Sequence, residues 1–178
     1  NTHHKHKPPN YLSKYIQKPI EQEVLFYSGK IETDAKYFID KIEQGIKHKE
    51  NKNYVTNVKG QMTDWKYFLD DKYFIELVTD IFKSANVMHK NLPSCRLTDA
   101  WGIKLQPHDH TNIHDHRPNL YSGAIYLSPS NQHLEFPEIN ITLKPEVGEF
   151  ALFSSFLKHF ATKGSDKAIK YGLSFNLG

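Results

Sequence analysis

The chain has 178 residues, of which 38% are hydrophobic and 24% charged, a composition that predicts one globular domain and excludes a disordered or fibrous chain. No apolar run approaches the roughly 20 residues of a membrane-spanning helix. The single cysteine, Cys95, cannot form an intramolecular disulfide, so we expect a reducing, cytoplasmic location. The net charge is only +3, and just two basic residues, Arg96 and Arg117, are arginines. Because phosphate recognition relies on arginine forks, we expect no nucleic-acid partner. The lack of a long apolar run predicts no membrane partner.

The N-terminal segment differs from the rest of the chain. Its first ten residues combine histidines, lysines and two prolines, and they lack the apolar segment of a secretory signal. We therefore predict a flexible tail over 1–20, followed by a single domain over 21–178.

Two stretches in the first half of the domain have the periodicity of amphipathic helices. After a strand-like run at 24–27, apolar residues recur every three or four positions to about Lys49, with Thr33 as the expected N-cap. The same spacing recurs over 70–89 and ends before a proline. Since each helix is apolar along one stripe only, we expect this support region, 33–92, to cover one outer face of a sheet.

The pattern changes after Cys95 to short strand-like runs separated by proline and glycine. The candidate strands are 98–106, 122–127, 139–143, 149–153, 156–161 and 168–177. Such spacing predicts a mainly β fold, a small barrel or jelly roll whose core spans 95–178.

A histidine cluster is the strongest chemical signal. Four of the eleven histidines fall within nine residues: His108, His110, His114 and His116. In an extended chain, residues i and i+2 share a face about 6.6 Å apart, so His114 and His116 can bind one metal ion while Asp115 points away. His159 lies in an apolar stretch, and a buried imidazole needs a partner that a metal can supply. His108 and His110 have polar surroundings and are interpreted as part of a solvated loop.

The histidines belong to an ordered set of motifs that resembles a known family. The set comprises His114-x-His116, the runs 120–127 and 148–159, and Ser174-Phe175-Asn176. It resembles the Fe(II)- and 2-oxoglutarate-dependent oxygenases, in particular a group from bacteria and their phages that is similar to prolyl hydroxylases.

The resemblance implies a double-stranded β-helix, a jelly-roll or cupin-like fold, with the activity of a 2-oxoglutarate-dependent dioxygenase. Fe(II) would be held by His114, His116 and His159, with 2-oxoglutarate and O2 as cosubstrates and ascorbate as a reductant in assays. The implied substrate is a prolyl or other amino-acid side chain in a peptide or protein, or a small molecule. The oligomeric state stays open.

The sequence departs from the wider superfamily at one ligand. The usual second ligand is Asp or Glu, and this chain has His116 there. Three imidazoles are neutral, so Fe(II) would keep its full charge and rely on the carboxylates of 2-oxoglutarate for compensation. Asp115 is an alternative third ligand if the strand bulges locally.

The last predicted strand alternates apolar and polar residues, which would turn Lys170 into the barrel as a cation for the distal carboxylate of 2-oxoglutarate. Similar proteins carry Arg at this position and Ser two residues later, where this chain has Gly172. Tyr126 is a second candidate for the same carboxylate, and Asn112 is a further cofactor-binding candidate. The alternatives are a solvated edge-strand lysine and a plain core tyrosine.

Two other functions compete with the oxygenase. A zinc hydrolase or hydratase would use the same three histidines with water in the fourth position. A non-catalytic cupin-like module would close its coordination shell with His110 or Asp109. Specificity would lie in the loops 52–65, 117–120 and 131–138. The side chains expected to exclude water from the site are Phe150, Leu152, Phe153 and Phe156.

Overall fold

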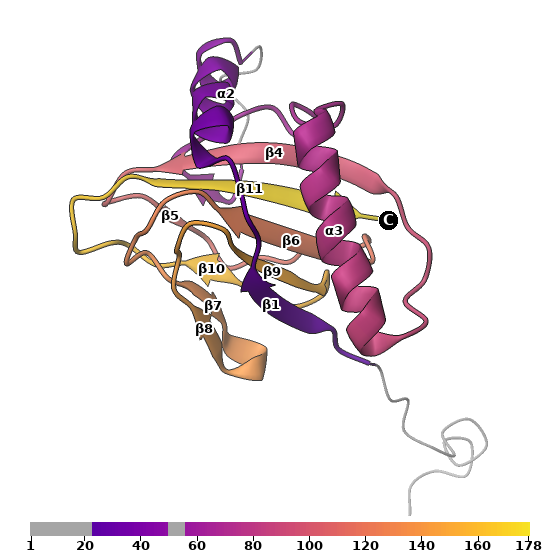
Figure 1. Ribbon diagram of the computed structural model, residues 1–178. Coiled ribbons are helices and arrows are strands. Elements are labelled where there is room, and N and C mark those ends of the chain that lie inside the picture. Colours follow the sequence, from indigo (N-terminus) through magenta and orange to yellow (C-terminus); the bar gives the residue numbers. More distant parts are fainter. Residues whose placement is uncertain (1–22, 50–55) are drawn as a thin grey trace, which may run out of the picture.

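A six-stranded antiparallel sheet dominates the structure, a computed structural model that describes residues 23–49 and 56–178 (Figure 1). The strand order is β1-β9-β6-β11-β4-β3. The strands are β1 (Phe26–Lys30), β9 (Glu149–Ser154), β6 (Tyr121–Tyr126), β11 (Lys170–Leu177), β4 (Leu97–Leu105) and β3 (Gln61–Met62). The predicted flexible tail over 1–20 lies outside the described residues.

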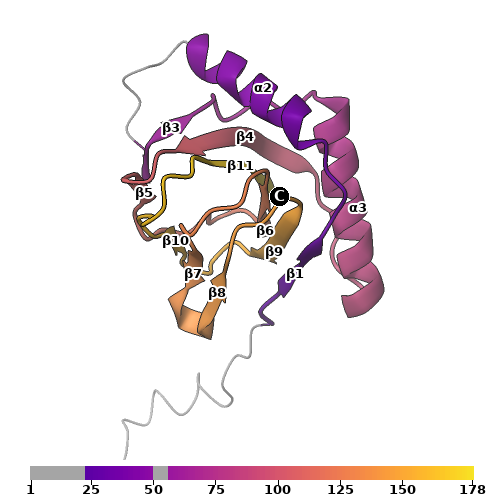
Figure 2. The ribbon, with the colours of Figure 1, turned by 60° about the vertical axis from the view of Figure 1, so that its left-hand side comes forward.

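Two smaller sheets accompany the large one. The first contains β10 (Phe160–Ala161), β7 (Leu134–Phe136) and β8 (Ile141–Leu143), and the second pairs β2 (Val58–Lys59) with β5 (His110–Thr111). In Figure 2 the large sheet curves, and the three-stranded sheet lies opposite it. This arrangement confirms the predicted mainly β fold of the double-stranded β-helix type.

Helices α2 (Ala35–Lys47) and α3 (Lys72–His89) cover the outer face of the large sheet (Figure 2). Their apolar residues, among them Phe38 and Phe74, form one core cluster with Leu173 and Phe175 of β11. The two supporting helices are therefore placed as predicted. No helix in the described part of the chain has the length and apolarity to cross a membrane.

The start of α2 differs from the prediction by one residue. Asp34, not Thr33, is the N-cap, and its carboxylate accepts a hydrogen bond from the Tyr37 backbone N–H at 3.1 Å. The Thr33 hydroxyl instead donates to the Ile31 carbonyl at 2.9 Å. Both residue types cap helices well, so sequence alone did not separate the two positions.

Short strands account for the other differences from the prediction. The expected strand 156–161 is mostly a turn, and only Phe160–Ala161 forms a strand. The expected loop 131–138 contains β7, whose Leu134 and Phe136 are buried, and runs into a 3-10 helix, Pro137–Ile139. Strands of two or three residues are too short to show a period in the sequence.

Strand β11 separates the core from the barrel interior, because alternate residues of a strand face opposite sides. Tyr171, Leu173 and Phe175 belong to the core under the helices. Lys170 and Gly172 line an internal cavity with Ser174. The strand thus carries both the packing that anchors the helices and one wall of the candidate site.

Candidate metal centre

A cavity inside the barrel collects residues that are far apart in the sequence. Its lining includes Lys170, Gly172 and Ser174 of β11, Trp101 and Ile103 of β4, Tyr126 of β6, and His114, His116 and His159. No Asp or Glu is among the lining residues that the structure describes. The cavity is therefore a place of nitrogen donors and apolar walls, without negative charge of its own.

Backbone pairing brings the three histidines together. His114 and His159 form an isolated antiparallel bridge, with N–H to carbonyl distances of 3.1 and 2.9 Å. The His116 N–H donates to the Ser155 carbonyl at 2.8 Å. His114, His116 and His159 lie outside the named strands. A few main-chain hydrogen bonds, and not an extended strand pairing, therefore fix the backbone that carries their side chains.

The three imidazoles face one another at ligand distance. One nitrogen from each ring lies within 4.8 Å of the other two, and the His116 and His159 Nε2 atoms are 3.1 Å apart. Two nitrogen ligands at about 2.1 Å from an ion and at right angles to each other lie about 3.0 Å apart. The observed separation therefore fits two neighbouring ligands of one metal ion.

Hydrogen bonds fix which ring nitrogen is free. The His114 Nδ1 atom lies 2.5 Å from the Asn112 carbonyl, and the His159 Nδ1 atom lies 3.0 Å from the Leu157 carbonyl. A carbonyl only accepts, so each Nδ1 carries the proton and each Nε2 keeps its lone pair. Such carbonyl partners typically orient metal-binding histidines.

The electrostatics of the cluster keep it neutral. Burial, followed by the neighbouring imidazoles, lowers the pKa of His116 to about 4 and the pKa of His159 to about 3. Burial also lowers the pKa of His114, against the hydrogen bond to the Asn112 carbonyl. Near neutral pH all three rings are uncharged, which is the form that binds a metal.

The other metal-ligand candidates do not join this cluster. The Asp115 carboxylate pairs with Arg117, at 3.0 Å from its Nη2 atom. The Asp109 carboxylate accepts from the Gln106 N–H at 2.8 Å, and His110 lies in β5 opposite Lys59. Among the described residues, no fourth His, Cys, Asp or Glu lies with the three, so the closed shell of a non-catalytic module is not supported.

Lys170 is 1% exposed, which excludes the solvated edge-strand alternative. Its Nζ atom donates to the Gln132 carbonyl at 3.1 Å and lies 5.1 Å from the centroid of the Tyr126 ring. Burial lowers the pKa of Lys170 to about 7. Tyr126 is also buried, and its raised pKa keeps the hydroxyl protonated. The structure places both residues in the cavity, and their role toward a cosubstrate stays a prediction.

Asn112 is not brought to the cavity. Its side chain is exposed, and its contribution is the carbonyl that orients His114. Of the four side chains expected to exclude water, only Phe153 lines the cavity. Phe150 and Leu152 belong to the core under the helices, and Phe156 packs beside β7 and β8.

Sequence reasoning missed two site residues, Trp101 and Gln132. The Trp101 ring lies 5.9 Å from the His116 ring and stacks edge-on with Trp65 at 4.5 Å, both between centroids. Trp101 occupies the same strand face as Ile103, so the alternation of the predicted strand could have revealed it. Gln132 lies in an irregular segment before β7, with no periodicity, and nothing in the sequence marked its carbonyl.

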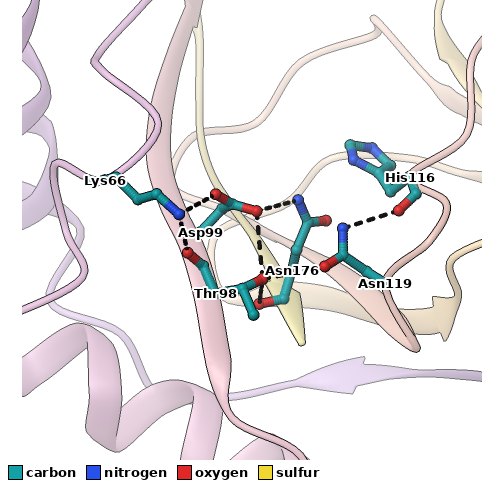
Figure 3. A network of polar contacts seen from close by, with 6 residues as sticks. All are labelled: Lys66, Thr98, Asp99, His116, Asn119 and Asn176. Atoms are coloured by element: carbon teal, nitrogen blue, oxygen red, sulfur yellow. Dashed lines mark hydrogen bonds and ion pairs between the residues drawn. The ribbon is translucent and has the colours of Figure 1, made fainter. Parts of the chain in front are cut away.

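A polar network supports the His116 segment from outside (Figure 3). The Asn119 side chain donates from Nδ2 to the His116 carbonyl at 2.9 Å and accepts from the Thr98 hydroxyl at 3.2 Å. The Asp99 carboxylate continues the network. It lies 2.8 Å from the Lys66 Nζ atom and accepts from the Asn176 Nδ2 atom at 3.0 Å. Asn119 thereby ties the loop that carries His116 to the ends of β4 and β11.

Comparisons with known proteins rest on structure alone. No family model and no curated protein matches the sequence. A viral collagen prolyl hydroxylase from Paramecium bursaria Chlorella virus-1, in complex with 2-oxoglutarate, has a TM-score of 0.63 at 14% identity, over 85% of this chain and 95% of that chain. A Pseudomonas putida prolyl-4-hydroxylase has a TM-score of 0.62 at 13% identity, over 85% and 91%.

HygX from Streptomyces hygroscopicus, with nickel, 2-oxoglutarate and hygromycin B bound, has a TM-score of 0.59 at 12% identity, over 87% of this chain and 82% of that chain. The chain has the fold of the Fe(II)- and 2-oxoglutarate-dependent oxygenases. At these identities the likeness establishes the oxygenase fold, which confirms the resemblance at that level.

Replacing His159 by Ala tests the metal centre. Two of the three converging nitrogens would remain, so we expect metal affinity to fall by more than the roughly 10- to 100-fold that loss of an outer partner costs. Anaerobic calorimetric titration with Fe(II) measures this. His108→Ala is the matched control, because the His108 side chain is 81% exposed. Equal affinities for the two variants would show that the cluster does not bind the ion.

Replacing Asn119 by Ala tests the support of His116. The variant keeps all three imidazoles and the backbone N–H bond to the His116 carbonyl but removes the second bond, from the Asn119 side chain, and we expect metal affinity to drop by roughly 10-fold or more. Asn86→Ala is the control, since the Asn86 side chain also bonds the backbone, accepting from the Leu92 N–H beyond the end of α3. Unchanged metal affinity in Asn119→Ala would contradict the positioning role.

Lys170 predicts a pH dependence of stability. Between the folded pKa of about 7 and the ordinary 10.5, the unfolded chain binds a proton that the folded chain does not. The free energy of unfolding therefore rises with pH over this window, and Lys170→Met removes that rise. Denaturant unfolding of both proteins from pH 6 to about 10.5 measures the difference. Parallel curves would contradict the buried, neutralised lysine.

Proposed function

We propose that this protein is a non-haem Fe(II)- and 2-oxoglutarate-dependent dioxygenase that hydroxylates its substrate. One observation carries the proposal: in a barrel with the oxygenase fold, three neutral imidazoles and a buried lysine line the same cavity. The first set suits a divalent metal, and the second suits the far carboxylate of a dicarboxylate.

The three histidines would hold the metal through ring nitrogen lone pairs, which in His114 and His159 the carbonyl partners leave free at Nε2. Bound Fe(II) would supply the redox chemistry by which O2 and 2-oxoglutarate become succinate, CO2 and one hydroxyl group on the substrate. The described residues provide no fourth side-chain ligand, so coordination positions stay open for small molecules. An open coordination shell is what distinguishes catalytic from structural metal sites.

Lys170 would orient the cosubstrate. Its amino group is buried with a carbonyl and an aromatic ring as neighbours, and no carboxylate of the described residues pairs with it. An incoming carboxylate would provide the missing counter-charge, and the low local dielectric would strengthen that pair. The protonated Tyr126 hydroxyl is a second donor in the same wall.

The charge balance of the cavity also favours a dianion. A metal ion on three neutral ligands keeps its two positive charges, and the lining residues contribute a lysine but no acid. A ligand with two carboxylates therefore brings one negative charge to the metal and one to the lysine. The apolar wall formed by Trp101, Ile103, Leu134 and Phe153 would keep water from the reacting atoms.

A zinc hydrolase on the same histidines is the second candidate. It would need the three imidazoles and a bound water. It would assign no chemical role to the buried Lys170, because hydrolysis at the metal requires no ammonium group elsewhere in the cavity. The oxygenase reading uses both features and is therefore preferred.

We infer two substrate classes for the reaction. Prolyl hydroxylases among the structural neighbours support a prolyl or other amino-acid side chain in a peptide or protein. HygX, solved with hygromycin B, supports a small molecule instead. A panel containing proline-rich peptides and free small molecules separates the two.

A succinate-release assay with Fe(II), ascorbate, O2 and 2-oxoglutarate tests the reaction class. We expect succinate from the wild-type chain and roughly 10-fold or greater loss of 2-oxoglutarate affinity in Lys170→Met, with metal binding retained. Lys104→Met is the control, since Lys104 pairs with Glu43 at 2.8 Å outside the cavity. Hydrolysis with zinc and no succinate with Fe(II) would refute the proposal.

A further inference from the structure

Gly172 is a glycine that neither the backbone nor the packing requires. Its backbone is not in the left-handed region, where a glycine would be favoured, and a Cβ atom built there meets nothing closer than 3.4 Å. Its nearest neighbours would be Ile103 side-chain carbons and the Ile125 carbonyl, at ordinary contact distances. An alanine would therefore fit the fold at this position.

Two other glycines of the large sheet show the contrast. A Cβ at Gly102 would collide with the Ile42 side chain of α2, and a Cβ at Gly123 would collide with the Phe175 ring. Close packing explains these two, because a core side chain occupies the space in each case. At Gly172 no side chain overlaps that space, and Gly172, like Gly123, lines the cavity.

The position of Gly172 indicates which part of a bound ligand would lie beside it. It lies on the inner face of β11 between Lys170 and Ser174, opposite Tyr126 of β6 in register. Ser174 pairs with Trp101, whose ring is 5.9 Å from that of His116. Gly172 thus lies between the ammonium group and the histidine cluster, where the carbon chain of a dicarboxylate bound at both ends would pass.

We propose that Gly172 is a specificity-determining residue that lets the cavity accept a 2-oxo dicarboxylate with a methyl branch on its chain. This inference rests on the proposed function, since it assumes that Lys170 and the metal hold the two ends of the ligand. The absent Cβ and the branch are of equal size, so the branch fills the space that the missing methyl group leaves. Filling it buries apolar surface without displacing Ile103.

Calorimetric titration of the Ni(II)-loaded chain with 2-oxoglutarate, racemic 3-methyl-2-oxoglutarate and racemic 4-methyl-2-oxoglutarate tests the proposal. Nickel suits imidazole ligands, so the histidine cluster can be loaded with it. We expect the wild-type chain to bind at least one branched acid about fourfold more tightly than 2-oxoglutarate, as one buried methyl group predicts.

Gly172→Ala reverses the preference. We expect it to bind 2-oxoglutarate within about threefold of the wild type and the preferred branched acid roughly tenfold more weakly, because the two methyl groups then compete for one space. Gly29→Ala is the matched control. Gly29 lies in β1 of the same sheet, outside the cavity, and its Cβ would meet Phe150 at a comparable 3.3 Å.

The outcomes separate this inference from the function beneath it. If the wild-type chain binds 2-oxoglutarate but neither branched acid, or if Gly172→Ala leaves the ratio of affinities unchanged, the specificity role is wrong and the oxygenase proposal stands. If the Ni(II)-loaded chain binds none of the three acids, both are wrong. An equal change in Gly29→Ala would assign the effect to the sheet and overturn the role of Gly172.

Discussion

The candidate site depends on the backbone bridge between His114 and His159. Two main-chain hydrogen bonds join these residues, although four strands, β6 to β9, lie between them in the sequence. The hydrogen bond from the His116 N–H to the Ser155 carbonyl lies beside this bridge. These bonds leave little freedom for the backbone that carries the three rings. Preorganised ligands of this kind lose little conformational entropy when an ion binds.

The charge of the cavity also depends on few residues. Neutral imidazoles lie at one end and a buried lysine at the other, and the described lining offers no acid to either. Burial disfavours the charged ammonium group and lowers the pKa of Lys170 to about 7, so the lining holds less positive charge than its residue types suggest. A dianionic ligand would favour the protonated form of Lys170 and so restore the positive charge of its ammonium group. In the proposed function, the carboxylates of the ligand would supply the negative charge that the described lining lacks.

The sequence was most informative where periodicity was long. The two helices, the alternation along β11 and the burial of Lys170 follow from patterns of eight or more residues. It was least informative for β7 and β10, because two or three residues carry no period, and for the cap of α2, where Thr33 and Asp34 both have suitable side chains. The three histidines could be singled out by residue type and spacing. The Asn119 side chain donates to the His116 carbonyl and Gln132 accepts with its own carbonyl, and only the folded backbone places these two carbonyls.

The separation of the metal-binding segments along the chain has a consequence for how the protein folds. His116 and His159 are 43 residues apart, and β1 pairs with β9 across more than half of the chain. Contacts of such long range close large loops and form slowly, so the unfolded chain offers no assembled site to an ion. A metal that binds only the finished barrel draws the folding equilibrium toward it by mass action. The supply of metal in the cell would then govern not only turnover but also how long each molecule survives.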